Sequence, residues 1–137
     1  MDKILTIDGP SASGKGSLTR AIAIALNFNV LDSGLLYRAY AYFYEKGVTT
    51  NHIGKKIQGL SFRFNSGDVQ VFDDMKEITS LLRSENTAKV ASALSSQKET
   101  RKNLLDIQRS FYHGNGLVAD GRDMGTVVFP NARLKIF

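Results

Sequence analysis

The sequence predicts an α/β fold in which a parallel β-sheet is flanked by helices and carries a small antiparallel insert. Short apolar runs alternate with helical patterns along the chain, and the first such pair encloses a glycine-rich loop. Between Val48 and Arg83 the apolar residues instead alternate with period two, which predicts the insert. With 137 residues, 42% of them hydrophobic, the chain is long enough for one compact domain.

Residues 1–47 are expected to form the first part of the core. Ile4–Ile7 is predicted to be a buried strand, and a helix is predicted over Leu18–Leu26, with Asn27 closing it. Apolar residues three or four apart predict the face of this helix that packs on the sheet. They are Leu18, Ala21, Ile22, Ala25 and Leu26.

A second strand and helix are predicted directly afterwards. Val30-Leu31 forms a short apolar run that leads into Asp32-Ser33-Gly34. The helix that follows is expected to end near Gly47, and its apolar residues share one face. These residues are Leu36, Ala39, Tyr40 and Phe43.

Residues 48–83 are predicted to form the antiparallel insert. A short helix is expected over Asn51–Gln58, after which Leu60, Phe62 and Phe64 alternate with polar residues. Ser66-Gly67-Asp68 supplies a turn. The chain then returns along the strand 69–73, and a weaker third run covers 76–78.

Residues 84–137 are predicted to hold two helices and the return to the core sheet. One helix starts at Glu85, with Ser84 as its cap, and the other covers Gln97–Tyr112, with a capping box of Ser96 and Glu99. A buried strand then runs to Asp120-Gly121, a loop continues through Pro130, and the run 134–137 begins another strand. Because that strand lacks a covering helix, we expect an incomplete sheet and a chain that is a piece of a longer protein.

Composition narrows the classes of partner. The net charge is +5, and the basic residues are scattered rather than blocked, so we expect small anionic substrates and no nucleic acid. The absence of cysteine excludes disulfides, and His52 and His113 lie too far apart for a zinc motif. No apolar run is long enough to cross a membrane, and no signal peptide is visible, so we expect no membrane partner and a cytoplasmic location.

The loop after the first strand carries the clearest chemical signal. Gly9, Gly14 and Lys15 nearly match the phosphate-binding pattern G-x-x-x-x-G-K-[ST], in which backbone N–H groups cradle phosphates. Gly16 stands where a hydroxyl would contact Mg²⁺, and Ser17 follows one residue later, so direct coordination by Ser17 stays open. The alternative is a plain glycine-rich turn with a solvated lysine. The residues predicted to bind the nucleotide are Gly9, Pro10, Ser11, Ala12, Ser13, Gly14, Lys15, Gly16 and Ser17.

Three motifs together resemble the N-terminal portion of the bacterial cytidylate kinase family. They are Gly9–Ser17, the run 31–34 with Tyr37-Arg38, and the run 119–130. Adenylate kinases are similar at the loop but carry Asp-Gly-Phe-Pro-Arg where this chain has Asp120-Gly121-Arg122-Asp123-Met124. The resemblance implies a P-loop NTPase-type sheet whose insert belongs to the NMP-binding region. This chain departs from the family at Met75 and at 81–83, and the arginine-bearing lid is absent after residue 137.

Site residues are carried over from the family position by position. The resemblance implies that ATP and Mg²⁺ are bound, with Lys15, Asp120 and Arg122 catalytic, and with Ser17 and Asp120 at the metal, Asp120 through water. A carboxylate beside the phosphate loop suits a magnesium nucleotide, although Asp120 read alone is also an ordinary residue of a strand-end turn. The residues implied around CMP or dCMP are Ser33, Tyr37, Arg38, Ser92, Arg101, Arg122 and Asp123.

The expected activity is transfer of the γ-phosphoryl group of ATP to CMP or dCMP. The acceptor phosphate is already ionised near neutral pH, so no general base is required, and catalysis rests on positioning and charge neutralisation. Two alternatives stay open: an inactive nucleotide-binding fragment, and a kinase for another nucleoside monophosphate. We expect the protein to be a monomer.

Overall fold

The computed structural model describes residues 3–10, 15–65 and 67–137, with Lys15 described by its backbone alone. The chain divides into two compact units. The sheet unit comprises Met1–Ser33, Phe64–Asp68 and Gln108–Phe137, and the helical unit comprises Gly34–Arg63 and Val69–Ile107. Our division into segments 1–47, 48–83 and 84–137 stays a prediction.

The sheet unit is built on four parallel strands in the order β2-β6-β1-β7. The strands are β1 (Ile4–Asp8), β2 (Asn29–Asp32), β6 (Leu117–Gly121) and β7 (Leu134–Ile136). The two central strands, β1 and β6, are almost wholly buried, as their apolar runs predicted. The predicted fold class is confirmed.

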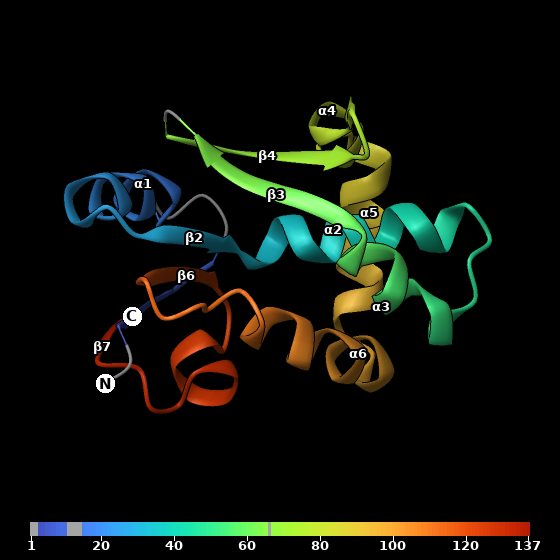
Figure 1. Cartoon of the computed structure of the whole chain (residues 1–137). Helices are drawn as coiled ribbons and strands as arrows, with labels where there is room; N and C mark the ends of the chain where they lie inside the picture. Colours follow the sequence, from blue (N-terminus) through green and yellow to red (C-terminus); the bar gives the residue numbers. More distant parts are fainter. Residues whose placement is uncertain (1–2, 11–14, 66) are drawn as a thin grey trace. The chain divides into compact units, whose positions relative to one another are not determined.

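Two helices cover opposite faces of this sheet (Figure 1). Helix α1 (Lys15–Leu26) contacts β6, β2 and β1, whereas the π-helix η1 (Met124–Val128) contacts β1 and β6. Successive side chains of a strand point to opposite faces of the sheet. Asp120 and its strand neighbour Ile7 point toward α1, whereas Thr6 points toward η1. A Cβ on Gly125 of η1 would lie 2.7 Å from the Thr6 hydroxyl oxygen, so this close approach requires glycine.

Helix α1 forms where the sequence predicted it, but the predicted buried face is wrong. Leu18 and Leu26 are 42% and 49% exposed, Ala21 and Ala25 are exposed, and Ile22 is half-buried. The residues that face the sheet are instead Thr19 and Ala23, with 2% and 1% exposure. Small side chains at these two positions let the helix axis approach the strands, and the Thr19 hydroxyl bonds to Asp120.

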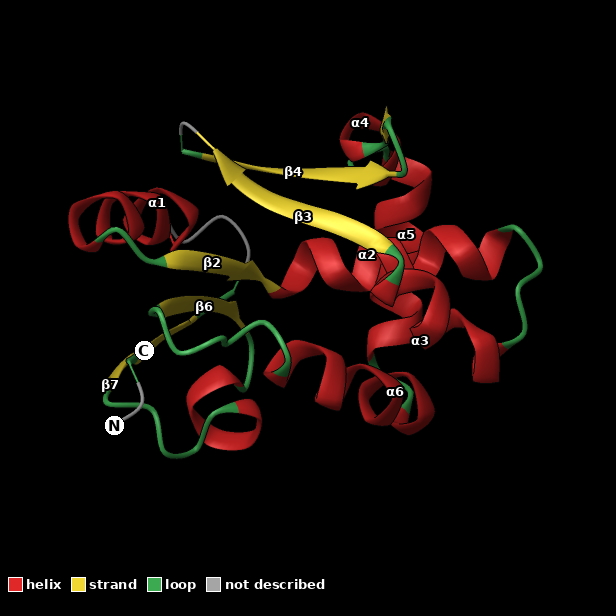
Figure 2. Ribbon diagram, viewed as in Figure 1, coloured by secondary structure: helices red, strands yellow, loops and turns green. Residues whose placement is uncertain are grey.

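The remaining five helices in the described part of the chain lie wholly or largely in the helical unit (Figure 2). They are α2 (Ser33–Glu45), α3 (Thr50–Gln58), α4 (Thr79–Leu82), α5 (Glu85–Ser95) and α6 (Lys98–Arg109). The predicted face of α2 is confirmed, since Leu36, Ala39 and Tyr40 are fully buried and Phe43 is nearly so. Gly47, with φ of 84°, follows the helix as predicted.

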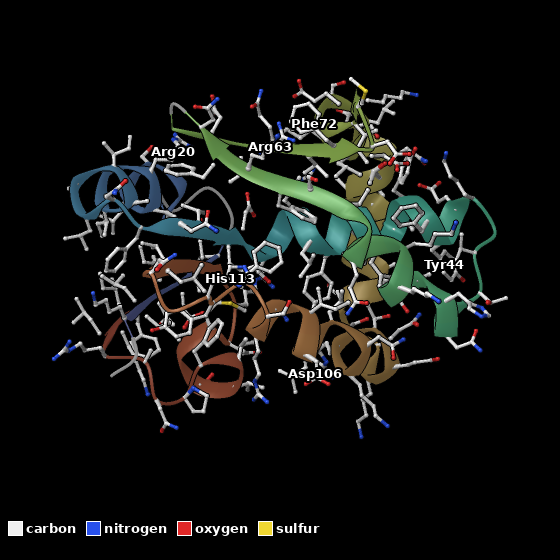
Figure 3. All side chains as sticks on the ribbon, in the orientation of Figure 1. Arg20, Tyr44, Arg63, Phe72, Asp106 and His113 are labelled. Carbon is white, nitrogen blue, oxygen red and sulfur yellow. The ribbon has the colours of Figure 1, made fainter. Side chains whose placement is uncertain are left out.

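The predicted antiparallel insert is a three-stranded sheet in the order β3-β4-β5. Its strands are β3 (Leu60–Asn65), β4 (Asp68–Asp73) and β5 (Lys76–Glu77). The Arg63 guanidinium lies over the Phe72 ring, 4.7 Å from its centre (Figure 3). Asp74 takes the left-handed conformation, with φ of 55°, at the turn before β5, so the turn forms although Met75 stands there and not glycine.

Two local expectations about the helices differ from the structure. Ser84 caps α5 by accepting from the Thr87 N–H, as predicted, but the capping box before α6 is wrong. Ser96 donates to the Ala93 carbonyl at the end of α5, and Glu99 accepts from Thr50. Helix α6 ends at Arg109, three residues before the predicted end, and no sequence pattern predicted α4 or η1. No helix in the described part of the chain is long and apolar enough to cross a membrane.

Candidate functional site

The predicted phosphate loop lies at the carboxyl end of β1, a central strand of the sheet. Gly9 is half-buried and its N–H donates to the Gly121 carbonyl at 3.2 Å, which ties the start of the loop to the end of β6. Ser11, Ala12, Ser13 and Gly14 lie outside the described residues. Lys15 and Gly16 open α1, and Ser17 is exposed in its first turn. The phosphate-binding pattern requires a strand before the glycine-rich segment and a helix after it, and β1 ends at Asp8 and α1 starts at Lys15 accordingly.

Asp120 lies on β6 beside this loop, with only 8% of its surface exposed. Its Oδ2 accepts a hydrogen bond of 3.1 Å from the hydroxyl of Thr19, which is buried on α1. The strand register places Asp120 between Ile7 and Asp32, on the α1 face of the sheet. This carboxylate is therefore held in a fixed orientation close to the start of α1.

Mg²⁺ is held by few protein groups when it accompanies a nucleotide. It keeps several waters and needs only one or two carboxylates besides the phosphates. Among residues 3–10, 15–65 and 67–137 no group of three or more His, Cys, Asp or Glu side chains could hold a metal. Asp120, a hard oxygen donor held at the strand end, fits the outer-sphere role. Ser17 is exposed in the first turn of α1, and its contact with the metal stays a prediction.

The opposite face of the sheet carries the turn of Arg122 and Asp123. Both side chains are exposed, and Asp123 has left-handed backbone angles, φ 58° and ψ 22°. The turn leads into η1, whose Val127 and Val128 N–H groups bond back to the Asp123 carbonyl. This arrangement presents a cation and an anion side by side at the carboxyl end of β6.

Both ends of η1 are fastened by charged side chains. Asp8 accepts from the first two N–H groups of η1, those of Met124 and Gly125, at 2.7 and 2.9 Å. Arg109 donates from Nε to the Val128 carbonyl at 3.0 Å and from Nη2 to the Val127 carbonyl at 3.2 Å. These charges have the signs that suit the two ends of a helix dipole.

Ser33 lies beside the end of β6 and is 4% exposed. Its hydroxyl donates to Oε1 of Gln108, at 2.9 Å. A Cβ on Gly121 would lie 2.5 Å from the Ser33 Cβ, so only glycine at position 121 allows this packing. Ser33, Gly121 and Gln108 therefore form one packed group within the sheet unit.

The helical unit carries the other predicted acceptor residues. Tyr37 and Arg38 are half-buried on α2, and Arg38 Nη1 donates to the Leu82 carbonyl at 3.3 Å. Ser92 on α5 and Arg101 on α6 are exposed. The predicted acceptor residues are thus shared between the units, with Ser33, Arg122 and Asp123 in the sheet unit.

Sequence reasoning missed Asp8, Thr19 and Gln108 as parts of this site. Thr19 follows Lys15 by one helical turn, and a polar residue at that position is the only local signal that could have singled it out. Asp8 and Gln108 carry no such signal, because their partners come from distant segments of the chain.

Residues 5–137 match the family model described as cytidylate kinase. The chain belongs to the cytidylate kinase family. A cytidylate kinase of Saccharophagus degradans is 45% identical over 143 residues, which cover 100% of this chain and 64% of that protein. Cytidylate kinase 2 of Haemophilus influenzae is 41% identical over 98% of this chain and 63% of its own length. For a cytidylate kinase of Polynucleobacter asymbioticus the identity is 44%, over 98% of this chain and 62% of the relative.

The chain therefore spans a little under two thirds of the length of these curated cytidylate kinases. The match covers the loop of Gly9–Ser17, the strand end at Asp120 and the turn of Arg122 and Asp123. Membership of the cytidylate kinase family confirms the resemblance predicted from the sequence. The roles of the individual site residues stay predictions.

Proposed function

We propose that this chain acts as a nucleoside monophosphate kinase that transfers the γ-phosphoryl group of ATP to CMP or dCMP. The observation that carries the proposal is the buried Asp120 carboxylate, which Thr19 orients at the end of β6, next to the strand that leads into the loop. A carboxylate held there suits the magnesium ion of a nucleotide bound on the loop. The family match supports the same reaction.

The donor nucleotide is assigned to the loop and to α1. Backbone N–H groups of Gly9–Ser17 would bind the phosphates, and Lys15 would reach the terminal ones. When bound, Mg²⁺ would neutralise charge on the phosphate oxygens. Asp120 would hold the water shell of the ion, and Thr19 keeps that carboxylate in place.

In the transfer step, a phosphate oxygen of CMP forms a bond to the γ-phosphorus of ATP. The bond between that phosphorus and the β,γ-bridging oxygen breaks, which yields CDP and ADP, or dCDP and ADP from dCMP. The acceptor oxygen is already ionised, so no side chain has to remove a proton. Lys15 and Arg122 would neutralise the negative charge that gathers on the transferred group.

The acceptor is assigned to side chains whose chemistry matches CMP. Arg38 and Arg122 each carry paired N–H groups of the kind that bind a phosphate. Asp123 can accept from the cytosine amino group, and Arg101 can donate to the acceptor edge of the base. Ser33, Tyr37 and Ser92 complete the proposed set with hydroxyl groups.

The proposal is tested by ATP- and Mg²⁺-dependent conversion of CMP to CDP by the 137-residue chain, with Lys15→Ala as the comparison. We expect the variant to lose about 3 to 4 kcal/mol of transition-state stabilisation, or on the order of a hundredfold to a thousandfold in rate. Equal rates in the two proteins would contradict the role of Lys15. Omission of Mg²⁺ should abolish turnover in both.

Two alternatives have distinct outcomes in the same assay. ATP binding without any turnover would identify an inactive nucleotide-binding chain. Preference for UMP or AMP over CMP and dCMP would identify a kinase for another nucleoside monophosphate. Sedimentation at the assay concentration tests the predicted monomer, and the cytoplasmic location stays a prediction.

A further inference from the structure

Asp8 uses both oxygens of its carboxylate on two consecutive backbone N–H groups. Oδ1 accepts from Met124 at 2.7 Å and Oδ2 accepts from Gly125 at 2.9 Å. These two N–H groups open η1 and have no acceptor within the helix. Hydrogen bonds to an ionised group are about twice as strong as those between neutral groups. The carboxylate therefore fixes the first turn of η1 firmly to the end of β1.

The residues just before this turn are those assigned to the acceptor. Arg122 and Asp123 have exposed side chains, so little packing holds them, yet Asp123 keeps left-handed backbone angles. This conformation is uncommon outside glycine, although Asp tolerates it better than most residues, and contacts that fix the neighbouring backbone favour it. The surroundings here are the Asp8 carboxylate at the first turn and the Arg109 guanidinium at the last.

We propose that Asp8 is a positioning residue for the acceptor nucleotide, acting through the turn of Arg122 and Asp123. Its carboxylate holds the backbone N–H groups of Met124 and Gly125, which directly follow Arg122 and Asp123, and so sets where these two side chains meet the phosphate and the base. The proposal rests on the proposed function, because it takes Arg122 and Asp123 to bind CMP. Asp8 does not itself contact the reacting atoms.

Asp8 also stands directly before Gly9, the first residue of the phosphate loop. The two sites nevertheless depend on it differently. Gly9 is tied to the Gly121 carbonyl through its own backbone, at 3.2 Å, and that bond needs no side chain at position 8. Loss of the carboxylate should therefore weaken binding of the acceptor and leave binding of ATP nearly unchanged.

The test compares Asp8→Asn with Asp106→Asn by titration calorimetry against CMP and, separately, against ATP with Mg²⁺. Asparagine has nearly the same shape as aspartate, but its NH₂ group would face one of the two backbone N–H groups that Asp8 binds. The variant therefore loses one of the two hydrogen bonds and the negative charge. We expect the affinity of Asp8→Asn for CMP to fall about tenfold or more, and its affinity for ATP to stay within about twofold. Asp106 lies exposed on α6 (Figure 3), so its variant controls for the loss of one negative charge.

A second measurement uses the unaltered chain and needs no variant to fold. In amide NMR spectra, the Met124 and Gly125 N–H protons should exchange slowly with solvent, and their signals should move on addition of CMP. If these protons exchange freely, or their signals ignore CMP, the positioning role is wrong.

The outcomes separate this inference from the proposed function. If the unaltered chain binds ATP but not CMP, the proposed acceptor is wrong and the positioning role is wrong with it. If the unaltered chain binds CMP and Asp8→Asn binds it equally well, the positioning role alone is wrong. Equal losses of CMP and ATP affinity in Asp8→Asn, or a matching loss of CMP affinity in Asp106→Asn, would also overturn it.

Discussion

Helices α1 and α2 bury different kinds of side chain, small ones in α1 and large apolar ones in α2. In α2 the apolar residues chosen from their spacing, such as Leu36 and Tyr40, are fully buried. In α1 the corresponding choice fails, because Leu18 and Leu26 are exposed, while Thr19 and Ala23 face the sheet. The comparison shows that spacing identifies a helix more reliably than it identifies the buried face.

The difference has a physical cause in what each helix packs against. Large side chains of α2 fill the interior of the helical unit, so burial follows hydrophobicity. Helix α1 lies against the strand that carries Asp120, and a buried carboxylate requires a hydrogen-bond partner. The Thr19 hydroxyl donates to this carboxylate, so we infer that the hydrogen bond favours the rotation of α1 that leaves its leucines exposed.

The largest expected effect comes from the same truncation made in both helices. Leu36→Ala removes a fully buried side chain and should lower the free energy of unfolding by about 2 to 5 kcal/mol. Leu18→Ala should cost less than about 1 kcal/mol, because that side chain is 42% exposed. Urea denaturation followed by circular dichroism measures both values. Equal losses would contradict the assignment of the faces.

Enlarging alanines of α1 tests the rotation of that helix directly. Ala23→Leu would force extra methyl groups between the helix and the sheet, and should cost about 1 to 3 kcal/mol. Ala25→Leu, on the exposed side, should change the free energy of unfolding by no more than about 0.5 kcal/mol. Thermal unfolding of the two variants in the same buffer measures both losses of stability. A larger loss in Ala25→Leu than in Ala23→Leu would show that the buried face is the one that spacing predicted.

Removing the hydroxyl of Thr19 tests why α1 is rotated. Thr19→Val keeps the shape of the side chain and deletes the donor to Asp120, so stability should fall by about 1 to 2 kcal/mol. Thr19→Ser keeps the hydroxyl and serves as the control. Chemical denaturation gives the stability, and a titration with ATP and Mg²⁺ should show weaker binding for the valine variant alone. If the stability of Thr19→Val is unchanged, the hydrogen bond to Asp120 is not what determines the rotation of α1.

The smallest effect on stability is expected just beyond the end of α2. There the Nζ atom of Lys46 lies over the Tyr42 ring, 4.6 Å from its centre. A hydrogen bond to Tyr42, helped by the charges of Tyr42 and Asp73, raises the pKa of Lys46 above its usual 10.5. A raised folded-state pKa gives stability that is fully present below pH 10.5 and is lost as the pH rises through the folded-state value. At pH values below 10.5, Lys46→Met should lower the melting temperature by a small amount. Above the folded-state pKa of Lys46, the substitution should leave the melting temperature unchanged. Lys89→Met, at an exposed position on α5, controls for the loss of one positive charge.

The candidate site also contains features of two kinds. Some are defined by neighbouring residues, and others by contacts between distant segments of the chain. The segment predicted to bind phosphate and the turn of Arg122 and Asp123 were singled out from short runs of sequence, because neighbouring residues define them. The residues that hold the site were missed, because each is defined by a partner far along the chain. Thr19 lies 101 positions from Asp120, Asp8 lies 116 from Met124, and Gln108 lies 75 from Ser33.

By itself, the sequence determined the order of the predicted strands and helices, the parallel sheet with its antiparallel insert, and the position of the glycine-rich segment between the first strand and the first helix. These features follow from periodicity and turn chemistry, which act over a few residues. Only the tertiary structure decided which side of α1 meets the sheet, that residues 124–128 form a π-helix, and which side chains hold Asp120 and Ser33. Those outcomes depend on hydrogen bonds to buried polar groups, and the partners of such groups are chosen only when distant strands and helices come together.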